Sequence, residues 1–249
     1  MFDLTGKVAI VTGCNTGLGQ GMALALAKAG ADIVGVNRSA PTETMALMES
    51  TGRKFHSVIA DMSKMDSVDR VVKEAVAAFG KVDILVNNAG IIRRNDALEF
   101  TEQDWDDVMD VNIKAVFFMS QGFAKQVIAQ GSTGNIINIA SMLSYQGGIR
   151  VPSYTASKSG VMGVTRLLAN EWAKHGINVN AIAPGYMATD NTSALRADED
   201  RSSEILNRIP AGRWGTPDDM AGPIVFLASD ASRYVNGYTI AVDGGWLAR

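Results

Sequence analysis

Short apolar runs alternate along this chain with longer segments of helical periodicity, and this alternation restricts the fold more than any other feature. The apolar runs cover residues 8–11, 33–36, 55–60, 83–86, 135–140, 179–183 and 238–242. The helical segments cover residues 17–28, 67–79, 102–130 and 153–174, and Gly30, Gly80 and Gly176 follow three of them as stop signals. Strands that are apolar throughout and separated by helices are typical of a parallel sheet covered on both faces. The sequence therefore predicts an α/β fold, a doubly wound, Rossmann-like parallel sheet of about seven strands.

The chain shows no boundary at which a second domain would begin. It has 249 residues, a length at which α/β sequences often form one domain. No Pro/Ser-rich linker, internal repeat or low-complexity segment interrupts it, and its 25 glycines have no repeat period. We expect one domain over residues 1–249, with glycines in tight turns or where the backbone approaches a ligand.

A polar, charge-rich stretch from Thr189 to Ser203 follows the sixth predicted strand. Open α/β sheets bind ligands beyond the carboxyl ends of their strands. This position favours a mobile substrate lid at about residues 187–213, with a solvated loop as the alternative.

Charge and cysteine content exclude several classes of protein. Lys and Arg number 23 and Asp and Glu 26, so the net charge of −3 gives no indication of a nucleic-acid partner. No apolar run is long enough to span a membrane, and the first residues lack the pattern of a signal peptide. The single cysteine, Cys14, excludes an internal disulfide and fits a reducing compartment, which we take to be the cytoplasm. His56 and His175 lie in separate segments, so no metal site is expected.

A glycine-rich loop joins the first predicted strand to the first predicted helix. Its glycines are Gly13, Gly17 and Gly19, in the spacing G-x-x-x-G-x-G, which differs from the common G-x-G-x-x-G pattern. Unpaired N–H groups and a partial positive charge at a helix N-terminus suit a pyrophosphate, and glycines allow close approach. The loop predicts a dinucleotide site, with Cys14 as a small space-filling residue because no nearby base would activate it.

The end of the second predicted strand bears on the choice of nucleotide. An acidic residue there would bind the adenosine ribose of NAD, but this chain has Asn37 and Arg38. Asn37 is able to hydrogen-bond a ribose hydroxyl, and Arg38 could accept the 2′-phosphate of NADP or stack on adenine. These residues leave NAD and NADP both open.

Tyr154 and Lys158 are four residues apart in a predicted helix and therefore share one face. A tyrosine has a pKa near 10, and a neighbouring ammonium lowers it, so that the phenol can exchange a proton with an alcohol or carbonyl. Ser141 ends the preceding strand, where its hydroxyl could hold a carbonyl oxygen beside Tyr154. These three residues predict an active site for proton transfer.

Taken together, these motifs resemble the short-chain dehydrogenase/reductase family over essentially the whole chain. The matching segments are Thr12 to Gly19, the N-N-A-G run at 87–90, the Pro184-Gly185 pair, and the tetrad Asn112, Ser141, Tyr154 and Lys158. The resemblance implies that Tyr154 is the general acid/base, that Lys158 lowers its pKa and binds the nicotinamide ribose, and that Ser141 orients the substrate carbonyl. It also implies that Asn112 supports a water-mediated proton relay through Lys158. Asn88 and Asn112 have structural alternatives, as a brace for the central strand and as a helix-kink residue.

The resemblance assigns a further set of residues to the cofactor. With the tetrad members Tyr154 and Lys158, the cofactor-binding residues are Gly13, Asn15, Thr16, Gly17, Leu18, Gly19, Asn37, Arg38, Asp61, Met62, Asn88, Ala89, Gly90, Pro184, Gly185, Met187 and Thr189. It implies NAD(H), with NADP(H) use open because of Arg38, and a homotetramer.

Segments 90–94, 104–109, 141–154 and 235–249 are most similar to family members that oxidise keto-deoxy sugar acids in uronate and pectin breakdown. Such a substrate carries a carboxylate, which a guanidinium binds well. The candidates are Arg93, Arg94 and Arg150, and Gln146 and Ser141 could meet hydroxyl or carbonyl oxygens. Gluconate dehydrogenases and oxoacyl reductases share the scaffold, and a nucleotide-sensing protein without catalysis is a further alternative.

Overall fold

The computed structural model describes residues 1–249 and contains one parallel sheet of seven strands. The strand order is β3-β2-β1-β4-β5-β6-β7, and every neighbouring pair is parallel. The strands are β1 (Val8–Thr12), β2 (Asp32–Asn37), β3 (Phe55–Ile59), β4 (Ile84–Asn87), β5 (Gly134–Ile139), β6 (Ile177–Pro184) and β7 (Thr239–Val242). The predicted α/β architecture and its seven strands are confirmed, with bounds that shift by one or two residues.

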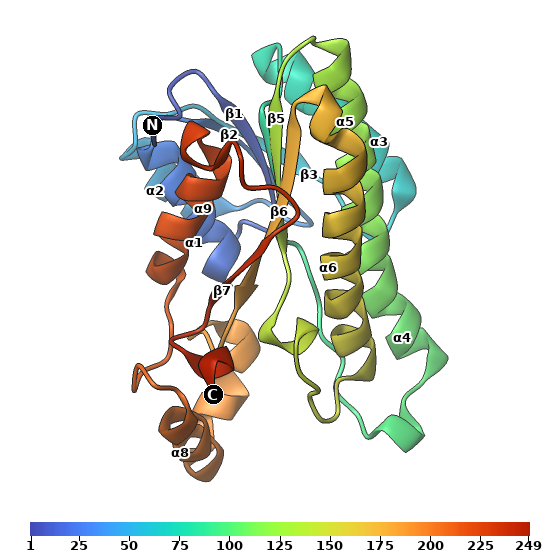
Figure 1. The fold of residues 1–249 in the computed structure, drawn as a ribbon, viewed down its shortest axis with the longest axis vertical. Coiled ribbons are helices and arrows are strands. Elements are labelled where there is room, and N and C mark those ends of the chain that lie inside the picture. Colours follow the sequence, from blue (N-terminus) through green and yellow to red (C-terminus); the bar gives the residue numbers. More distant parts are fainter.

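Helices cover both faces of the sheet, as the apolar strands require (Figure 1). On one face lie α1 (Gly17–Lys28), α2 (Thr42–Glu49) and α9 (Ala221–Ala228), and on the other α3 (Met65–Phe79), α5 (Ala115–Ala129) and α6 (Pro152–Trp172). Two large apolar clusters fill these two interfaces, and both are fully screened from water. The chain is therefore a three-layer molecule with a core on each side of the sheet.

Four α-helices escaped prediction from the sequence, two of them in the polar stretch after β6. α2 has eight residues and little apolar periodicity, and α9 (AGPIVFLA) is apolar almost throughout, so neither shows the amphipathic pattern. The predicted long helix over 102–130 is interrupted: α4 (Glu102–Met109) passes through a π-helical turn, Asp110–Lys114, into α5.

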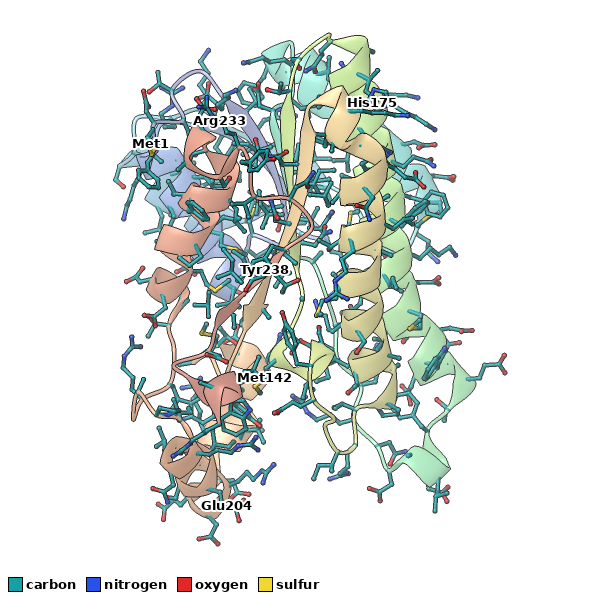
Figure 2. All side chains as sticks on the ribbon, viewed as in Figure 1. Met1, Met142, His175, Glu204, Arg233 and Tyr238 are labelled. Atoms are coloured by element: carbon teal, nitrogen blue, oxygen red, sulfur yellow. The ribbon has the colours of Figure 1, made fainter.

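The polar stretch after β6 is largely helical, with a 3₁₀ turn at Asp190–Thr192, then α7 (Ser193–Ala197) and α8 (Glu199–Arg208). Glu204 of α8 and His175 after α6 mark opposite ends of the molecule, so α8 lies at the end toward which β6 points (Figure 2). The buried side of α8 is held by Ile205, which packs with Met142 and Trp246. No helix of the structure has both the length and the apolar character needed to cross a membrane.

Candidate active site

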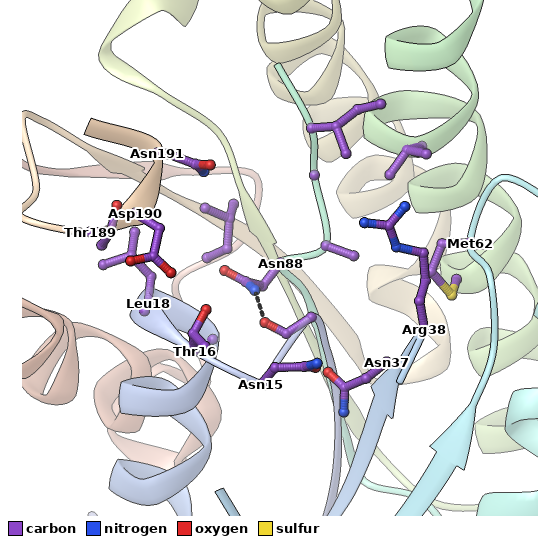
Figure 3. Close-up of a pocket in the computed structure, with 18 of the residues that line it drawn as sticks. Asn15, Thr16, Leu18, Asn37, Arg38, Met62, Asn88, Thr189, Asp190 and Asn191 are labelled. Carbon is purple, nitrogen blue, oxygen red and sulfur yellow. Dashed lines mark hydrogen bonds between the residues drawn. The ribbon is translucent and has the colours of Figure 1, made fainter. Parts of the chain in front are cut away.

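A cavity of about 700 Å³ lies at the carboxyl ends of the strands, at the place where the strand order reverses between β1 and β4. The loop after β1 and residues Thr189–Asn191 form one side of it, while Arg38 and Met62 stand on the other (Figure 3). Every residue that the sequence assigned to the cofactor lines this cavity, from the glycine loop to Thr189. The fold thus gathers residues that are up to 176 positions apart in sequence, from Gly13 to Thr189.

The glycine loop has the features that a pyrophosphate site needs. α1 begins at Gly17, its N-cap Thr16 makes no side-chain capping bond, and its first turn carries no acidic residue. The N–H groups of this turn therefore remain available to an anion, and the helix dipole favours one. The residues present fit a dinucleotide.

The three glycines of the loop serve packing as well as access. A β-carbon on Gly19 would collide with the carbonyl oxygen of Gly13 and the amide of Asn88. Gly13 itself has φ +68°, and its β-carbon would lie 3.0 Å from the Cα of Ala89. Gly17 has φ +58°, and a β-carbon on it would lie 3.5 Å from Cγ2 of Thr189. The expectation that all three are needed only for close approach to a ligand was incomplete, since Gly19 packs against the protein itself.

Asn88 braces the loop in the way its structural alternative anticipated. Its Nδ2 donates to the carbonyl oxygens of Thr12 and Gly13 at 2.9 and 2.8 Å, and its N–H donates to Thr12 Oγ1. The dashed line in Figure 3 marks one of these bonds.

Asn37 lines the cavity, and its side chain is also hydrogen-bonded within the protein. It is buried, its Oδ1 accepts the N–H of Cys14 at 2.8 Å, and its Nδ2 lies 3.5 Å from the Cys14 sulfur. The amide oxygen is therefore used within the protein, which leaves the amide nitrogen as the side-chain donor for a ribose hydroxyl. Burial raises the pKa of the Cys14 thiol, which agrees with a space-filling role.

Arg38 and Asp61 both line the nucleotide end of the cavity. Arg38 is exposed and pairs with no carboxylate within 4 Å. The N–H and hydroxyl of Ser63 donate to Asp61 at 2.9 Å, and these bonds, with the charges of Arg38 and Lys64, hold the pKa of Asp61 below its usual value. The guanidinium of Arg38 is thus free to meet a ligand.

The structure brings Ser141, Tyr154 and Lys158 together in the wall of the cavity. Ser141 lies close enough to Tyr154 for its side chain to lower the pKa of the phenol, and the Lys158 nitrogen lies 5.6 Å from the centre of the tyrosine ring. Burial lowers the pKa of Lys158 to about 8. Burial also raises the pKa of Tyr154, and this outweighs the opposite effects of Ser141 and the Arg94 charge. The expected lowering by Lys158 is not seen, because the ammonium is itself desolvated and is directed to the carbonyl oxygen of Ile139 at 2.6 Å.

Asn112, the fourth member of the tetrad, lies in the π-helical turn and is fully buried. Its Oδ1 accepts the N–H of Ile91 at 2.9 Å, and its Nδ2 donates to the Ile91 carbonyl and to Ser157 Oγ. A π-turn is a frequent feature of functional sites. Asn112 therefore fixes the loop after Gly90, and the expected kink is a π-turn.

The four proposed substrate side chains other than Ser141 differ in their position and in their partners. Arg93 lines the cavity, but Asp107 and Asp104 pair with it at 2.9 and 3.5 Å. Arg150 pairs with Asp96 at 3.3 Å and does not line the cavity. Gln146 does not line it either, because its Oε1 accepts from Trp246 Nε1 and from Arg208. Arg94 is exposed and is not a lining residue either; it donates only to the carbonyl oxygen of Asn191, at 3.1 Å, and has no carboxylate partner.

Sequence reasoning missed several residues of the cavity wall. They are Ser39, Ser63, Lys64, Gln103, Asp107, Asp110, Val111, Asp190, Asn191 and Thr192. The position of Asp190–Thr192 just after Pro184 and Gly185 was the available signal, whereas Gln103 and Asp107 reach the cavity only because α4 folds beside it.

Comparisons with known proteins agree with this site. Residues 13–247 match the family model described as Enoyl-(Acyl carrier protein) reductase. The 2-dehydro-3-deoxy-D-gluconate 5-dehydrogenases of Escherichia coli and Dickeya dadantii are 74% and 73% identical, over 100% of this chain and 98% of each of theirs. A gluconate 5-dehydrogenase from Burkholderia cenocepacia, solved with NADP and tartrate, superimposes with a TM-score of 0.93 at 39% identity and covers 100% of this chain and 98% of its own.

A structure from Agrobacterium tumefaciens with bound NADP has a TM-score of 0.95 and 57% identity, with 100% and 99% of the two chains covered. Family match, identity and catalytic geometry lead to one conclusion: the chain belongs to the short-chain dehydrogenase/reductase family and is an NAD(P)-dependent oxidoreductase.

Proposed function

We propose that this protein interconverts 2-dehydro-3-deoxy-D-gluconate and the 2,5-diketo acid 3-deoxy-D-glycero-2,5-hexodiulosonate, in the breakdown of pectin-derived uronates. The activity of its 74% identical relative supports this substrate. The tartrate in the Burkholderia structure, a hydroxy acid, supports the same chemical class. A related gluconate 5-dehydrogenase is 40% identical, so gluconate is the second candidate.

The observation that carries the proposal is the position of Arg94. It is the one of the three candidate arginines without a carboxylate partner, and it donates to the backbone of Asn191, which lines the cavity. Its charge also lowers the pKa of Tyr154. A guanidinium near the reacting group would bind the substrate carboxylate and so present the 5-hydroxyl end toward Tyr154. An acyl chain on a carrier would gain nothing from such a charge.

Each residue of the site has its own role in the oxidation. Ser141 donates a hydrogen bond to the substrate oxygen, and Tyr154 removes the hydroxyl proton as the carbon–oxygen double bond forms. Lys158 holds positive charge beside Tyr154 and has donors left for a ribose. A nicotinamide held in the cavity would supply the acceptor for the hydride that leaves the same carbon. In the reverse direction Tyr154 returns the proton to the carbonyl oxygen.

The nucleotide, the assembly and the cellular setting complete the proposal. We infer NAD(H) as the main cofactor, with NADP(H) accepted through Arg38, and a lid formed by residues 187–213. We also infer a cytoplasmic homotetramer. Phe118 on α5 and Leu167 on α6 are 40% and 49% exposed and would be covered by a second copy.

A substrate panel with the purified enzyme tests the proposal. 2-Dehydro-3-deoxy-D-gluconate should reduce the nucleotide faster than gluconate, other polyols or acetoacetyl thioesters do. Arg94→Ala should raise KM for the sugar acid about 10- to 100-fold, the value of a charged hydrogen bond, and leave nucleotide affinity unchanged. Arg150→Ala, which breaks an exposed pair, is the matched control. Equal KM in the two variants would refute the assignment of Arg94.

A further inference from the structure

Ser144 lies outside the cavity, yet its hydroxyl connects two members of the catalytic tetrad. It is half-buried in the 3₁₀ turn Met142–Ser144 that follows Ser141. Its Oγ donates to the carbonyl oxygen of Lys158 at 2.7 Å and accepts the N–H of Ser141 at 3.3 Å. One side chain therefore joins the end of β5 to α6.

On the Ser141 side the contact completes a reciprocal cap. Ser141 Oγ accepts the N–H of Leu143 at 3.1 Å, while the N–H of Ser141 is bound by Ser144. A serine hydroxyl has one hydrogen and two lone pairs. Since a backbone donor occupies a lone pair of Ser141, its hydrogen remains free to be donated on the cavity side, to Tyr154 when no substrate is bound and to the substrate oxygen when one is.

On the Lys158 side the contact adds to the helix. In α6 the carbonyl of residue 158 accepts from the N–H four residues later, and its second lone pair takes the Ser144 hydroxyl. Lys158 and Ser141 are both buried, so a shift of either backbone would be resisted by packing. The bond fixes the separation of the strand end from the helix turn that carries Tyr154 and Lys158.

We propose that Ser144 is a positioning residue for this reaction, which sets the distance and direction of the Ser141 hydroxyl relative to Tyr154. The residue does not touch the cavity, and it acts through Ser141. Its effect should appear in catalysis and in the ionisation of Tyr154, while nucleotide binding, which uses the other end of the cavity, stays the same.

The ionisation effect has a definite sign. The hydrogen bond from Ser141 lowers the pKa of Tyr154, because it stabilises the phenolate. When Ser144 is lost, that bond weakens and the pKa of Tyr154 rises. The acidic limb of oxidation, where Tyr154 holds its proton, should then move to higher pH.

The test compares Ser144→Ala and Ser144→Thr with Ser50→Ala as the control. Ser50 also donates to a backbone carbonyl, that of Leu47 at 2.8 Å, and follows α2 away from the cavity. Ser144→Ala should lower kcat about 3- to 10-fold and move the pH profile upward by about half to one unit, the value of one neutral hydrogen bond. Ser144→Thr keeps a hydroxyl and should restore both. Ser50→Ala should change neither.

A second measurement needs no substrate and so separates this inference from the proposed function. The tyrosinate absorbance of the complex with oxidised nucleotide is titrated in wild type and in Ser144→Ala, each against its own Tyr154→Phe partner. The Tyr154 midpoint should be higher in Ser144→Ala. An unchanged midpoint in Ser144→Ala, or a Ser144→Thr protein that folds but keeps the shifted profile, would overturn the assignment. Failure of the proposed substrate would instead leave wild type inactive with the sugar acid.

Discussion

The side-chain nitrogen of Lys158 lies 2.6 Å from the backbone carbonyl oxygen of Ile139. This bond joins the second turn of α6, one turn after Tyr154, to the last residue of β5. It places a cation in a site that is screened from water, and the pKa of Lys158 falls to about 8 for that reason. The protein therefore accepts a cost in stability for a positioned ammonium.

The free energy of unfolding of wild type relative to Lys158→Met should depend on pH, and this dependence measures the cost. Below pH 8 both the folded and the unfolded chain hold the proton, so the folded state carries the full burial penalty. Between pH 8 and 10.5 only the unfolded chain keeps it, and stability rises with pH. Wild type should gain up to about 3 kcal/mol relative to Lys158→Met across this interval. Urea unfolding of both proteins without nucleotide measures the difference; parallel curves would contradict it.

Tyr154→Phe should remove nearly all turnover. The substitution keeps the ring and its packing but takes away the only group placed to exchange the substrate proton. We expect kcat to fall by about 10²- to 10⁴-fold, the contribution of general acid–base catalysis. Nucleotide affinity, followed by the fluorescence of bound reduced nucleotide, should stay within about twofold. Substantial activity in this variant would require another proton donor.

Arg38→Ala should separate the two nucleotides. The free guanidinium is suited to a 2′-phosphate, and NAD(H) lacks that group. The variant should raise KM for NADPH by about 10-fold or more and that for NADH by much less. Initial rates with each reduced nucleotide measure this. A wild-type preference for NADPH would contradict NAD(H) as the main cofactor, and an equal effect on both nucleotides would indicate stacking on adenine.

Gly19→Ala should destabilise the protein even without nucleotide. Its β-carbon would meet the Gly13 carbonyl oxygen and the Asn88 amide, which are fixed by the bonds of the loop. Overpacking of this kind costs about 1–3 kcal/mol. Gly222→Ala in α9, where a β-carbon meets nothing within 4 Å, is the control and should be neutral or stabilising. Thermal unfolding measures the melting temperatures of the two variants. Equal values would contradict the role of Gly19 in packing.

Arg249→Ala should loosen α8. The guanidinium donates to the carbonyl oxygens of Asn207 and Arg208 at 2.8 and 2.7 Å, so it caps the end of this helix. Without it, amides 205–208 should exchange about 3- to 10-fold faster, because charged hydrogen bonds at a helix end are lost. Hydrogen exchange followed by mass spectrometry measures this, with exposed Arg233→Ala as the control. Unaltered exchange in α8 would mean that the apolar contacts of Ile205 suffice to hold it.

Local sequence patterns predicted the strands, the glycine loop and the reactive residues because each depends on neighbours in the chain. β1 is buried at every position, and the helix after it begins at Gly17 as expected. Tyr154 and Lys158 share a face because four residues make about one helical turn. α2 and α9 were missed because their burial comes from the sheet and not from an amphipathic repeat of their own.

The sequence by itself determined the layered α/β plan, and it predicted a proton-transfer role for Tyr154, Lys158 and Ser141. Only the tertiary structure decided which candidates remain free to act. Asn37 is hydrogen-bonded to Cys14 and Gln146 to Trp246. Arg93 forms an ion pair with Asp107 and Arg150 one with Asp96, while Arg94 and Arg38 have no carboxylate partner. The physical reason is that each hydrogen bond or ion pair uses a donor or acceptor that could otherwise bind a ligand. The partners of these side chains lie 14 to 100 residues away in the sequence. A local sequence pattern therefore does not show which of two similar side chains has a partner in the folded protein.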